Sequence, residues 1–298
     1  MPIQDAWRIV CWRRAFALLL LLIAASSAAA EAPAQPVAAE AASATAAPVQ
    51  PGWTLSASFP APEAHQAAAA DEKQVYVISS TAVAAYDRSN GQRQWVSHGG
   101  QASHLNSGFL WQGKLLCAHS NYPQHPNTSQ IKAVDLTTGE LSDFKDFGVS
   151  DGSLTWAVHH EDAWWCNFAF YGAEQQKTRL VCYDDQWRET GSWTYPQQLY
   201  QFFGRYSLSG GIWHGDTLLV TDHDHPVIYR LRLPQTGSEL EWIDRRAAPF
   251  TGQGFAIDPT GNSASDTVDA ALNIALIGIN RGKRLVVFAA PVATPRTP

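Results

Sequence analysis

Short runs of β-branched and apolar residues alternate with polar turns along most of the chain, and this alternation repeats. Each repeat places a turn before an apolar run, as in "LWQGKLLCA" and "WHGDTLLVT". Helical periodicity is absent from the sequence after the N-terminal region. Five copies fit, and four short strands fit in each; the units span residues 61–100, 101–149, 150–203, 204–250 and 251–290. Four-stranded units of about 40 to 50 residues are typical of β-propeller blades.

One strand is left over at the start of this pattern and one is missing at its end. The segment "WTLSASFP" (Trp53 to Pro60) precedes the first unit, whereas the fifth unit ends after "KRLVVFAAP" without an outer strand. Pairing residues 53–60 with residues 283–291 would supply that strand and hide two sheet edges at once. We therefore predict an all-β fold, a five-bladed β-propeller of four-stranded blades, closed by the N-terminal strand.

The turns of the repeat carry a second marker. The segments "AAYDRSNGQRQW", "KAVDLTTGELSDF" and "VCYDDQWRETGSW" place Asp87, Asp135 and Asp184 at spacings of 48 and 49 residues. The first two resemble the Ala-x-Asp-x-x-Thr-Gly-x-x-x-Trp repeat of secreted bacterial β-propellers of the quinoprotein-repeat and YVTN-like type. The resemblance concerns the fold only. It implies that Asp and Gly form a blade corner and that Trp95 docks against the neighbouring blade, and it does not imply a bound quinone.

The N-terminal region has the pattern of a targeting signal followed by a linker. Arg8, Arg13 and Arg14 precede the apolar run "AFALLLLLIAA", and the small residues of "SSAAAEA" follow it. We expect residues 1–30 to be a cleaved bacterial signal peptide, residues 31–52 to be an Ala/Pro-rich linker, and residues 53–298 to form the propeller domain. The expected location is periplasmic or secreted, with no membrane attachment after cleavage.

Charge and cysteines limit the partners and the cross-links. The net charge is −6, and removal of residues 1–30, with three Arg and one Asp, would make it −8. An acidic chain without a Lys/Arg stripe is a poor nucleic-acid binder, so we expect no nucleic-acid partner. Pairing residues 167–170 with residues 178–181 would bring Cys166 opposite Cys182 and favour a disulfide, leaving Cys117 as a buried thiol.

Polar residues gather at one predicted end of the propeller axis. The starts of innermost strands and the ends of second strands share that end, and six of the ten histidines fall there: His65, His104, His119, His125, His223 and His225. Further polar residues, including Ser209 and Arg281, fall at the same end. We expect this end to bind a small polar or carbohydrate-derived ligand through Asn106, Asn121, Asp151, Trp156, Tyr206, His225 and Gln253. His98, His159, His160 and His214 are interpreted as solvated turn or outer-strand residues.

Register counting sharpens the site. If "LWQG" is a hairpin turn, His104 faces His119, and the same counting around "WHGD" puts Tyr206 level with His223. Facing imidazoles can share a divalent metal, act as acid and base, or cap strand ends as a structural pair. His104, His119 and His223 are therefore the candidate catalytic residues and the candidate metal ligands. Trp156 and Tyr171 are candidate sugar-stacking platforms, although packing between blades explains most tryptophans equally well.

Two classes of function remain open from the sequence. The first is a metal-assisted extracytoplasmic enzyme of the lactonase, cyclase, isomerase or lyase type. The second is a non-catalytic binding or envelope assembly module with a protein partner. The scarcity of axial carboxylates disfavours a two-carboxylate glycosidase, and "SLSGG" lacks the nucleophile elbow of a serine hydrolase.

Overall fold

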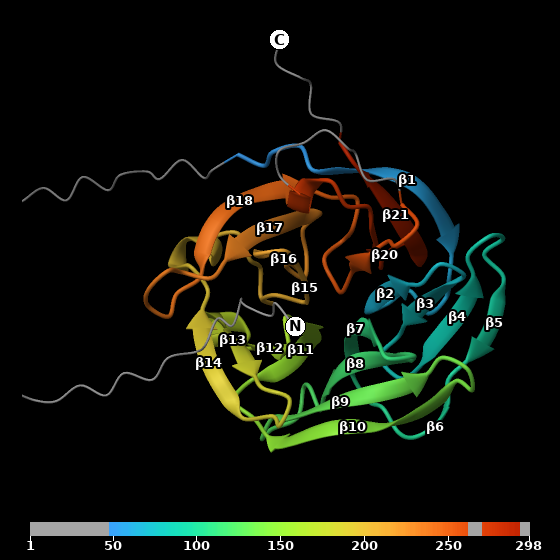
Figure 1. Cartoon of the computed structure of the whole chain (residues 1–298), viewed down its shortest axis with the longest axis horizontal. Helices are drawn as coiled ribbons and strands as arrows, with labels where there is room; N and C mark the ends of the chain where they lie inside the picture. Colours follow the sequence, from blue (N-terminus) through green and yellow to red (C-terminus); the bar gives the residue numbers. More distant parts are fainter. Residues whose placement is uncertain (1–47, 262–269, 293–298) are drawn as a thin grey trace, which may run out of the picture. The chain divides into compact units, whose positions relative to one another are not determined.

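Five antiparallel sheets surround a central axis in the computed structural model, which describes residues 48–261 and 270–292 (Figure 1). Each sheet is one blade, and the innermost strand of each blade lies closest to the axis. The five-bladed propeller predicted from the repeated turns is therefore confirmed. The expected signal peptide and most of the expected linker lie outside the described residues.

The first four blades follow the chain without interruption. Blade one contains β2 (Ala67–Ala70), β3 (Gln74–Ile78), β4 (Val83–Asp87) and β5 (Arg93–Val96). Blade two contains β7 (Leu105–Trp111), β8 (Lys114–Ser120), β9 (Thr128–Asp135) and β10 (Glu140–Val149), with the two-residue β6 (His98–Gly99) added parallel to β10. Blade three contains β11 (Ser153–His160), β12 (Ala163–Ala169), β13 (Arg179–Tyr183) and β14 (Glu189–Thr194). Blade four contains β15 (Gly210–His214), β16 (Thr217–Thr221), β17 (Val227–Arg232) and β18 (Glu241–Ala247).

The fifth blade joins the two ends of the ring. It contains β19 (Ala256–Ile257), β20 (Leu276–Asn280) and β21 (Leu285–Pro291), and its outer strand is β1 (Trp53–Pro60). β1 runs antiparallel to β21, from Trp53 opposite Pro291 to Pro60 opposite Leu285, with an irregularity between Leu55 and Ala57. The indole Nε1–H of Trp53 donates to the carbonyl of Ile274 at 2.8 Å. The predicted closure by an N-terminal strand is therefore confirmed.

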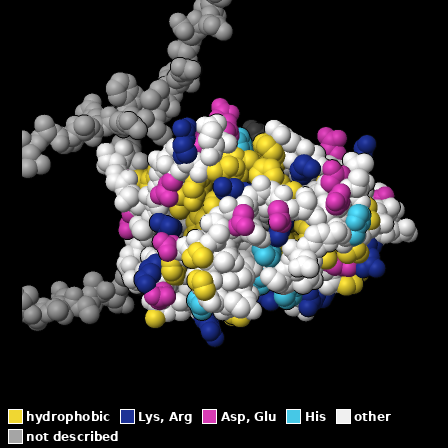
Figure 2. All heavy atoms as spheres, turned by 90° about the horizontal axis from the view of Figure 1, so that it is seen from below, with side chains coloured by type: hydrophobic (Ala, Val, Ile, Leu, Met, Phe, Trp, Pro, Cys, Tyr) yellow, Lys and Arg dark blue, Asp and Glu magenta, His cyan; other side chains and the backbone are white. Residues whose placement is uncertain are grey.

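Small residues stand at several positions of the innermost strands, where the five blades converge. β2 consists of four consecutive alanines, all buried. In β15, a Cβ atom on Gly211 would lie 2.4 Å from Cε2 of the buried Trp156, so only glycine lets β15 approach β11 at this point. The outer strands β5 and β10 are mostly exposed or half-buried instead. Figure 2 shows Lys and Arg interspersed with Asp and Glu on one side of the molecule.

The blade corners have the chemistry that the repeat predicts. A side-chain oxygen of Asp87 accepts hydrogen bonds from the backbone N–H and the hydroxyl of Ser89, and Asp135 accepts from the backbone N–H groups of Thr137 and Thr138. The corner glycine of blade two, Gly139, has a φ of 76°, which favours glycine. Trp95 of β5 packs against Gly139, so the aromatic residue at the end of one repeat docks on the corner of the next blade.

Non-strand elements in the described residues are short. They include the 3₁₀ helices η1 (Gly172–Lys177), η2 (Gln197–Leu199) and η3 (Ala270–Leu272). Within the ranges 48–261 and 270–292, no helix is both long enough and apolar enough to span a bilayer.

The predicted disulfide is wrong because the register of blade three differs by one residue. Cys166 lies opposite Val181, and Cys182 lies opposite Trp165. A one-residue shift moves a side chain to the other face of its sheet. Accordingly, Cys166 packs in the core shared with β8 and β9, whereas Cys182 packs in the core shared with blade four. Cys117 is fully buried, as predicted.

Candidate functional site

The polar end of the axis holds a cleft of about 100 Å³ to which all five blades contribute. Its walls come from the starts of the innermost strands and from the residues that follow the second strands, as the propeller geometry requires. We call it the polar cleft; it is lined by Gln66, His104, Asn106, Tyr122, Thr155, Tyr171, Tyr206, Ser209, His223, Gln253 and Arg281.

Arg281 binds two histidines across the polar cleft. Its Nη1–H donates to Nε2 of His223 at 3.0 Å, and its Nη2–H donates to Nε2 of His65 at 2.8 Å. Both imidazoles accept through Nε2, so each must be unprotonated at that nitrogen. Burial, helped by the positive charge of Arg281, lowers the pKa of His65 to about 4. The pair of neutral imidazoles therefore fixes the orientation of the guanidinium without neutralising its charge.

The segment after β16 positions His223 over the axis. The Asp222 side chain is buried and accepts hydrogen bonds from the backbone N–H groups of Asp224 and His225, the Nδ1–H of His225 at 2.9 Å and the hydroxyl of Tyr229 at 2.9 Å. These bonds fold the segment into a tight turn. Nδ1–H of His223 donates to Asp224 at 2.6 Å, which leaves Nε2 as the acceptor for Arg281.

Three tyrosines form an aromatic wall of the polar cleft. The ring centroids of Tyr122 and Tyr171 lie 5.0 Å apart, and those of Tyr171 and Tyr206 lie 5.5 Å apart. Tyr206 also packs on the ring of His223 at 4.3 Å, and Tyr122 packs on His104 at 5.4 Å. Burial raises the pKa of Tyr171, so its hydroxyl stays protonated. The wall therefore offers ring faces to a ligand and hydroxyl groups as donors.

Gln253 is the buried polar side chain of this site that lacks a partner. The residue is only 3% exposed, and Nε2 of its amide has no hydrogen-bond partner among the described residues. Its backbone adopts a φ of 74°, which is uncommon for a residue other than glycine. Two bonds hold it there: its N–H donates to the carbonyl of Asp222 at 3.2 Å, and its carbonyl accepts from the hydroxyl of Thr221 at 2.6 Å.

The floor of the polar cleft is held by bonds between blades. Nδ2–H of Asn106, in blade two, donates to the carbonyl of Leu154 in blade three at 3.1 Å. The hydroxyl of Thr155 donates to the carbonyl of Leu208, next to blade four, at 2.9 Å. The N–H and O–H donors of Asn106 and Thr155 therefore hold neighbouring blades together. Gln253 and Arg281, in contrast, have N–H donors with no partner among the described residues.

Six of the candidate residues predicted from the sequence line the polar cleft. They are His104, Asn106, Tyr171, Tyr206, His223 and Gln253. Tyr206 reaches His223 by ring contact and not by strand pairing, because the register of blade four sets Gly210 opposite Thr221. Tyr206 lies in the loop before β15, and this loop brings its ring to His223. The register counting predicted that the two residues are neighbours, but for a different reason.

The predicted pairing of His104 with His119 is wrong. The turn between β7 and β8 sets Leu110 opposite Leu115, and an irregularity between Leu105 and Gly108 then sets Leu105 opposite His119. His119 consequently contacts the segment before β7, where its Nε2 accepts from the backbone N–H of Ser103 at 3.1 Å. His119 does not line the polar cleft.

Four further predicted residues also lie outside the polar cleft. Asn121 holds its own loop by accepting from the N–H of Thr128 and donating to the carbonyl of Pro126. The Asp151 side chain is 82% exposed and faces Arg179, and His225 binds Asp222. Trp156 is fully buried in the core between blades three and four, so it is not a stacking platform.

The predicted metal ligands are not brought together. His104 and His223 line the polar cleft but His119 does not, for the register reason given above. In the part of the chain that the structure describes, no three His, Cys, Asp or Glu side chains are placed to hold a metal ion.

Sequence reasoning placed Arg281 at this end of the axis but did not count it among the candidate site residues. Arg281 follows β20 in blade five as His223 follows β16 in blade four, so its position at this end was predictable. Its role was not, because His65 and His223 are 216 and 58 residues away along the chain.

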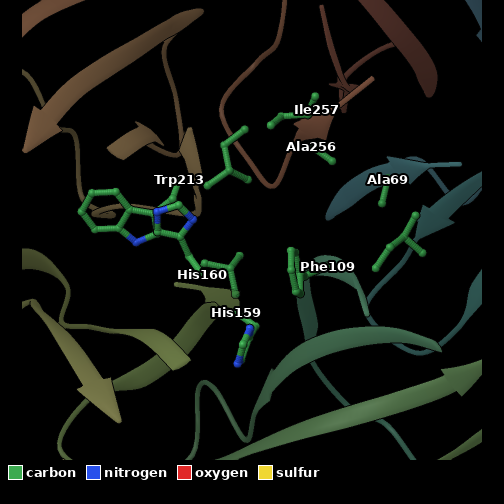
Figure 3. Close-up of a pocket in the computed structure, with 11 residues that line it drawn as sticks. Ala69, Phe109, His159, His160, Trp213, Ala256 and Ile257 are labelled. Carbon is green, nitrogen blue, oxygen red and sulfur yellow. The ribbon is translucent and has the colours of Figure 1, made fainter. Parts of the chain in front are cut away.

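The other end of the axis has a different chemistry. Figure 3 shows side chains from the five innermost strands around a second cavity, of about 140 Å³, lined mostly by apolar residues such as Phe109, Ile257 and Trp213. His160 stacks on Trp213 with ring centroids 5.6 Å apart, and His159 packs on Trp164 at 4.8 Å. These two histidines are therefore packed against tryptophans and are not simply solvated turn residues.

Comparisons with known proteins show the fold. No protein-family model and no curated protein matches the chain. Among solved structures, the glutaminyl cyclase of Myxococcus xanthus is similar with a TM-score of 0.51 and 7% identity, over 83% of this chain and 100% of that one. The hydrazine synthase of Kuenenia stuttgartiensis has a TM-score of 0.40 and 11% identity, over 75% and 69% of the two chains. BamB from Moraxella catarrhalis has a TM-score of 0.35 and 16% identity, over 78% and 60%. At these identities the likeness shows that the chain is a β-propeller and carries nothing about its site.

Proposed function

We propose that the protein is an extracytoplasmic β-propeller that binds a small polar ligand in the polar cleft. The observation that carries the proposal is the amide of Gln253. A buried N–H group without a partner costs about 1–3 kcal/mol, and native proteins rarely keep one without a reason. Gln253 is one of the residues that line the polar cleft, so a ligand oxygen that reaches this amide from the cleft would satisfy the donor.

The surroundings of Gln253 fit a ligand with several oxygen atoms. Protonated tyrosine hydroxyls and the hydroxyl of Ser209 line the same space as the Arg281 guanidinium. The tyrosine faces suit a flat or ring-shaped body, as carbohydrate-derived molecules have. This combination of one apolar wall and several donors is typical of small-molecule sites.

A second candidate is catalysis in the same cleft by His104. Burial lowers the pKa of His104, with Arg281 contributing, so the imidazole is neutral at pH 7 and can accept a proton. Opening of a lactone, cyclisation and β-elimination all require such a base beside a carbonyl group or an acidic carbon. This candidate needs no shared metal. A non-catalytic assembly role with a protein partner remains the alternative outcome.

The test uses the side-chain amide of Gln253 as a reporter. In ¹⁵N-labelled protein, its NH₂ signals should shift when D-glucose or D-glucuronate is added in the millimolar range, because a ligand oxygen would accept a hydrogen bond from Nε2. Native mass spectrometry of gently purified protein should in parallel show a retained small molecule. If neither sugar moves the signals and no small molecule is retained, the binding proposal is wrong.

Two variants separate a ligand role from a structural role. Gln253→Leu removes an unsatisfied donor, so binding should be lost while the free energy of unfolding stays within about 1 kcal/mol of the parent protein. Gln253→Asn keeps the amide on a shorter chain and is the matched control, with weakened binding expected. A large loss of stability in Gln253→Leu without any change in binding would show that the amide serves the fold.

A further inference from the structure

The polar cleft has an unbalanced charge. Of its eleven lining residues, Arg281 alone carries a permanent charge, and no Asp or Glu is among them. Its two partners are neutral imidazoles, and no carboxylate among the described residues forms an ion pair with it. The two acidic side chains beside His223 already have partners, because Asp222 accepts four hydrogen bonds and Asp224 accepts from His223.

Most of the N–H donors of the Arg281 side chain have no partner among the residues that the structure describes. A guanidinium has five N–H groups, and two of them bind His223 and His65. The remaining groups belong to a side chain whose orientation is already fixed from both sides. Such a fixed fork matches the two oxygens of a carboxylate, and little side-chain entropy is lost when it binds.

Resting on the binding function proposed above, we propose that the ligand is a small organic carboxylate with a hydroxylated ring. Its carboxylate would bind Arg281, a further oxygen would accept from Nε2 of Gln253, and its ring would lie against the wall formed by Tyr122, Tyr171 and Tyr206. A sugar acid has this chemistry. A neutral sugar would leave the Arg281 charge unpaired, and a cation would be repelled by it, although three aromatic rings alone would suit a cation.

Charged side chains near the polar cleft favour an anionic ligand. Arg205 lies over the ring of Tyr206 at 5.9 Å, and burial together with the nearby charge of Arg284, on the same turn, lowers the pKa of the Arg281 guanidinium. Arg205 and Arg284 therefore add positive charge near Arg281, and the exposed carboxylates of Asp151 and Asp224 oppose it in part. Positive potential at the mouth of a cleft accelerates the entry of anions.

The experiment compares D-glucuronate with D-glucose, which share a ring and differ in the carboxylate, by titration calorimetry and by the Gln253 amide signals. The proteins are the parent chain, Arg281→Met, Arg281→Lys and the control Arg284→Met, which removes the same charge from the same turn outside the polar cleft. We expect D-glucuronate to bind the parent at least about tenfold more tightly than D-glucose, which corresponds to one charge-assisted hydrogen bond.

Among the variants, Arg281→Met should lose that preference, Arg281→Lys should keep a reduced preference, and Arg284→Met should keep most of it. If D-glucose binds as tightly as D-glucuronate, or if Arg281→Met keeps the preference, the carboxylate proposal is overturned while the binding function stands. If D-glucuronate produces no heat and no shift of the Gln253 signals, and acetate and benzoate also produce none, the carboxylate proposal is overturned as well. Retention of a neutral molecule in native mass spectrometry would then still support the binding function. Circular dichroism of Arg281→Met verifies folding, and Arg281→Lys provides the same comparison if that variant does not fold.

Discussion

Trp53 is expected to contribute more to stability than any exposed position of the strand that closes the ring. It is 3% exposed, packs in the core between blades four and five with Ile274 and Phe255, and donates its indole N–H to the carbonyl of Ile274. Replacing a buried Trp by Ala costs about 3–5 kcal/mol, and the unpaired carbonyl places this case toward the upper end of that range. We therefore expect Trp53→Ala to lower the free energy of unfolding by about 4–5 kcal/mol.

Two further variants divide this loss into its causes. Trp53→Phe keeps an aromatic ring and removes the N–H donor, so a loss of about 1–2 kcal/mol is expected. Leu55→Ala, in the same strand, changes a side chain that is 58% exposed, and the loss should stay near 0.5 kcal/mol, about the usual size for surface positions. Urea unfolding followed by circular dichroism, with the denaturant dependence compared among variants, measures each value.

Equal stability of Trp53→Ala and Leu55→Ala would refute the role assigned to β1. It would mean that the strand adds to the fifth blade without belonging to the cooperative unit. A biphasic transition in Trp53→Ala alone would instead indicate that the fifth blade opens separately from the other four.

The remaining predictions concern protonation and packing near the axis. The ring signals of His65 should titrate with a pKa of about 4, and Arg281→Met should raise that pKa because a neighbouring positive charge is removed; an NMR titration measures both. In the unfolded chain His65 has a pKa near 6.5, so between pH 6.5 and about 4 the unfolded state binds a proton that the folded state does not bind. The free energy of unfolding should therefore fall as the pH drops from about 6.5 toward about 4. Gly211→Ala should destabilise the fold by at least about 1 kcal/mol because its Cβ would overlap Trp156, whereas Gly282→Ala, with 3.8 Å to its nearest neighbour, should be close to neutral in the same urea assay.

The blades were predictable because their signal is repeated. The turn at Asp87 recurs at Asp135, and in both turns the Asp side chain accepts from backbone N–H groups of the residues that follow. An error in reading one copy therefore does not change the number of blades that is predicted. The closure by residues 53–60 was predictable from the strand count, because the fifth unit lacked an outer strand and one strand was left over before the first unit. Pairing at the level of single residues was less secure, because one irregular position in a strand shifts every partner beyond it. For His119, the turn lies one residue later than the counting assumed, and an irregularity between Leu105 and Gly108 changes the register again. Cys166 lies in a regular ladder whose register differs by one residue from the one assumed.

The site was predictable in location and only partly in composition. The rule that strand starts and strand ends share one end of the axis placed His104, His223 and Gln253 correctly. It could not distinguish a side chain that points into the cleft from one that holds its own loop, as Asn121 does. The pairing of Arg281 with His65 depends on ring closure, which brings the first and last blades together, and no local pattern encodes it.

The closing strand also sets the order in which the ring can be completed. β1 is the first strand of the propeller in the chain, but its partner β21 is the last, and a ribosome or a secretion channel delivers them in that order. The first four blades can pair within themselves as they emerge, because each is built from neighbouring segments. Until residue 291 arrives, however, β21 is incomplete and β1 has an unpaired edge. Exposed edges of this kind invite pairing with other chains, so a partly delivered propeller is the form most at risk of aggregation.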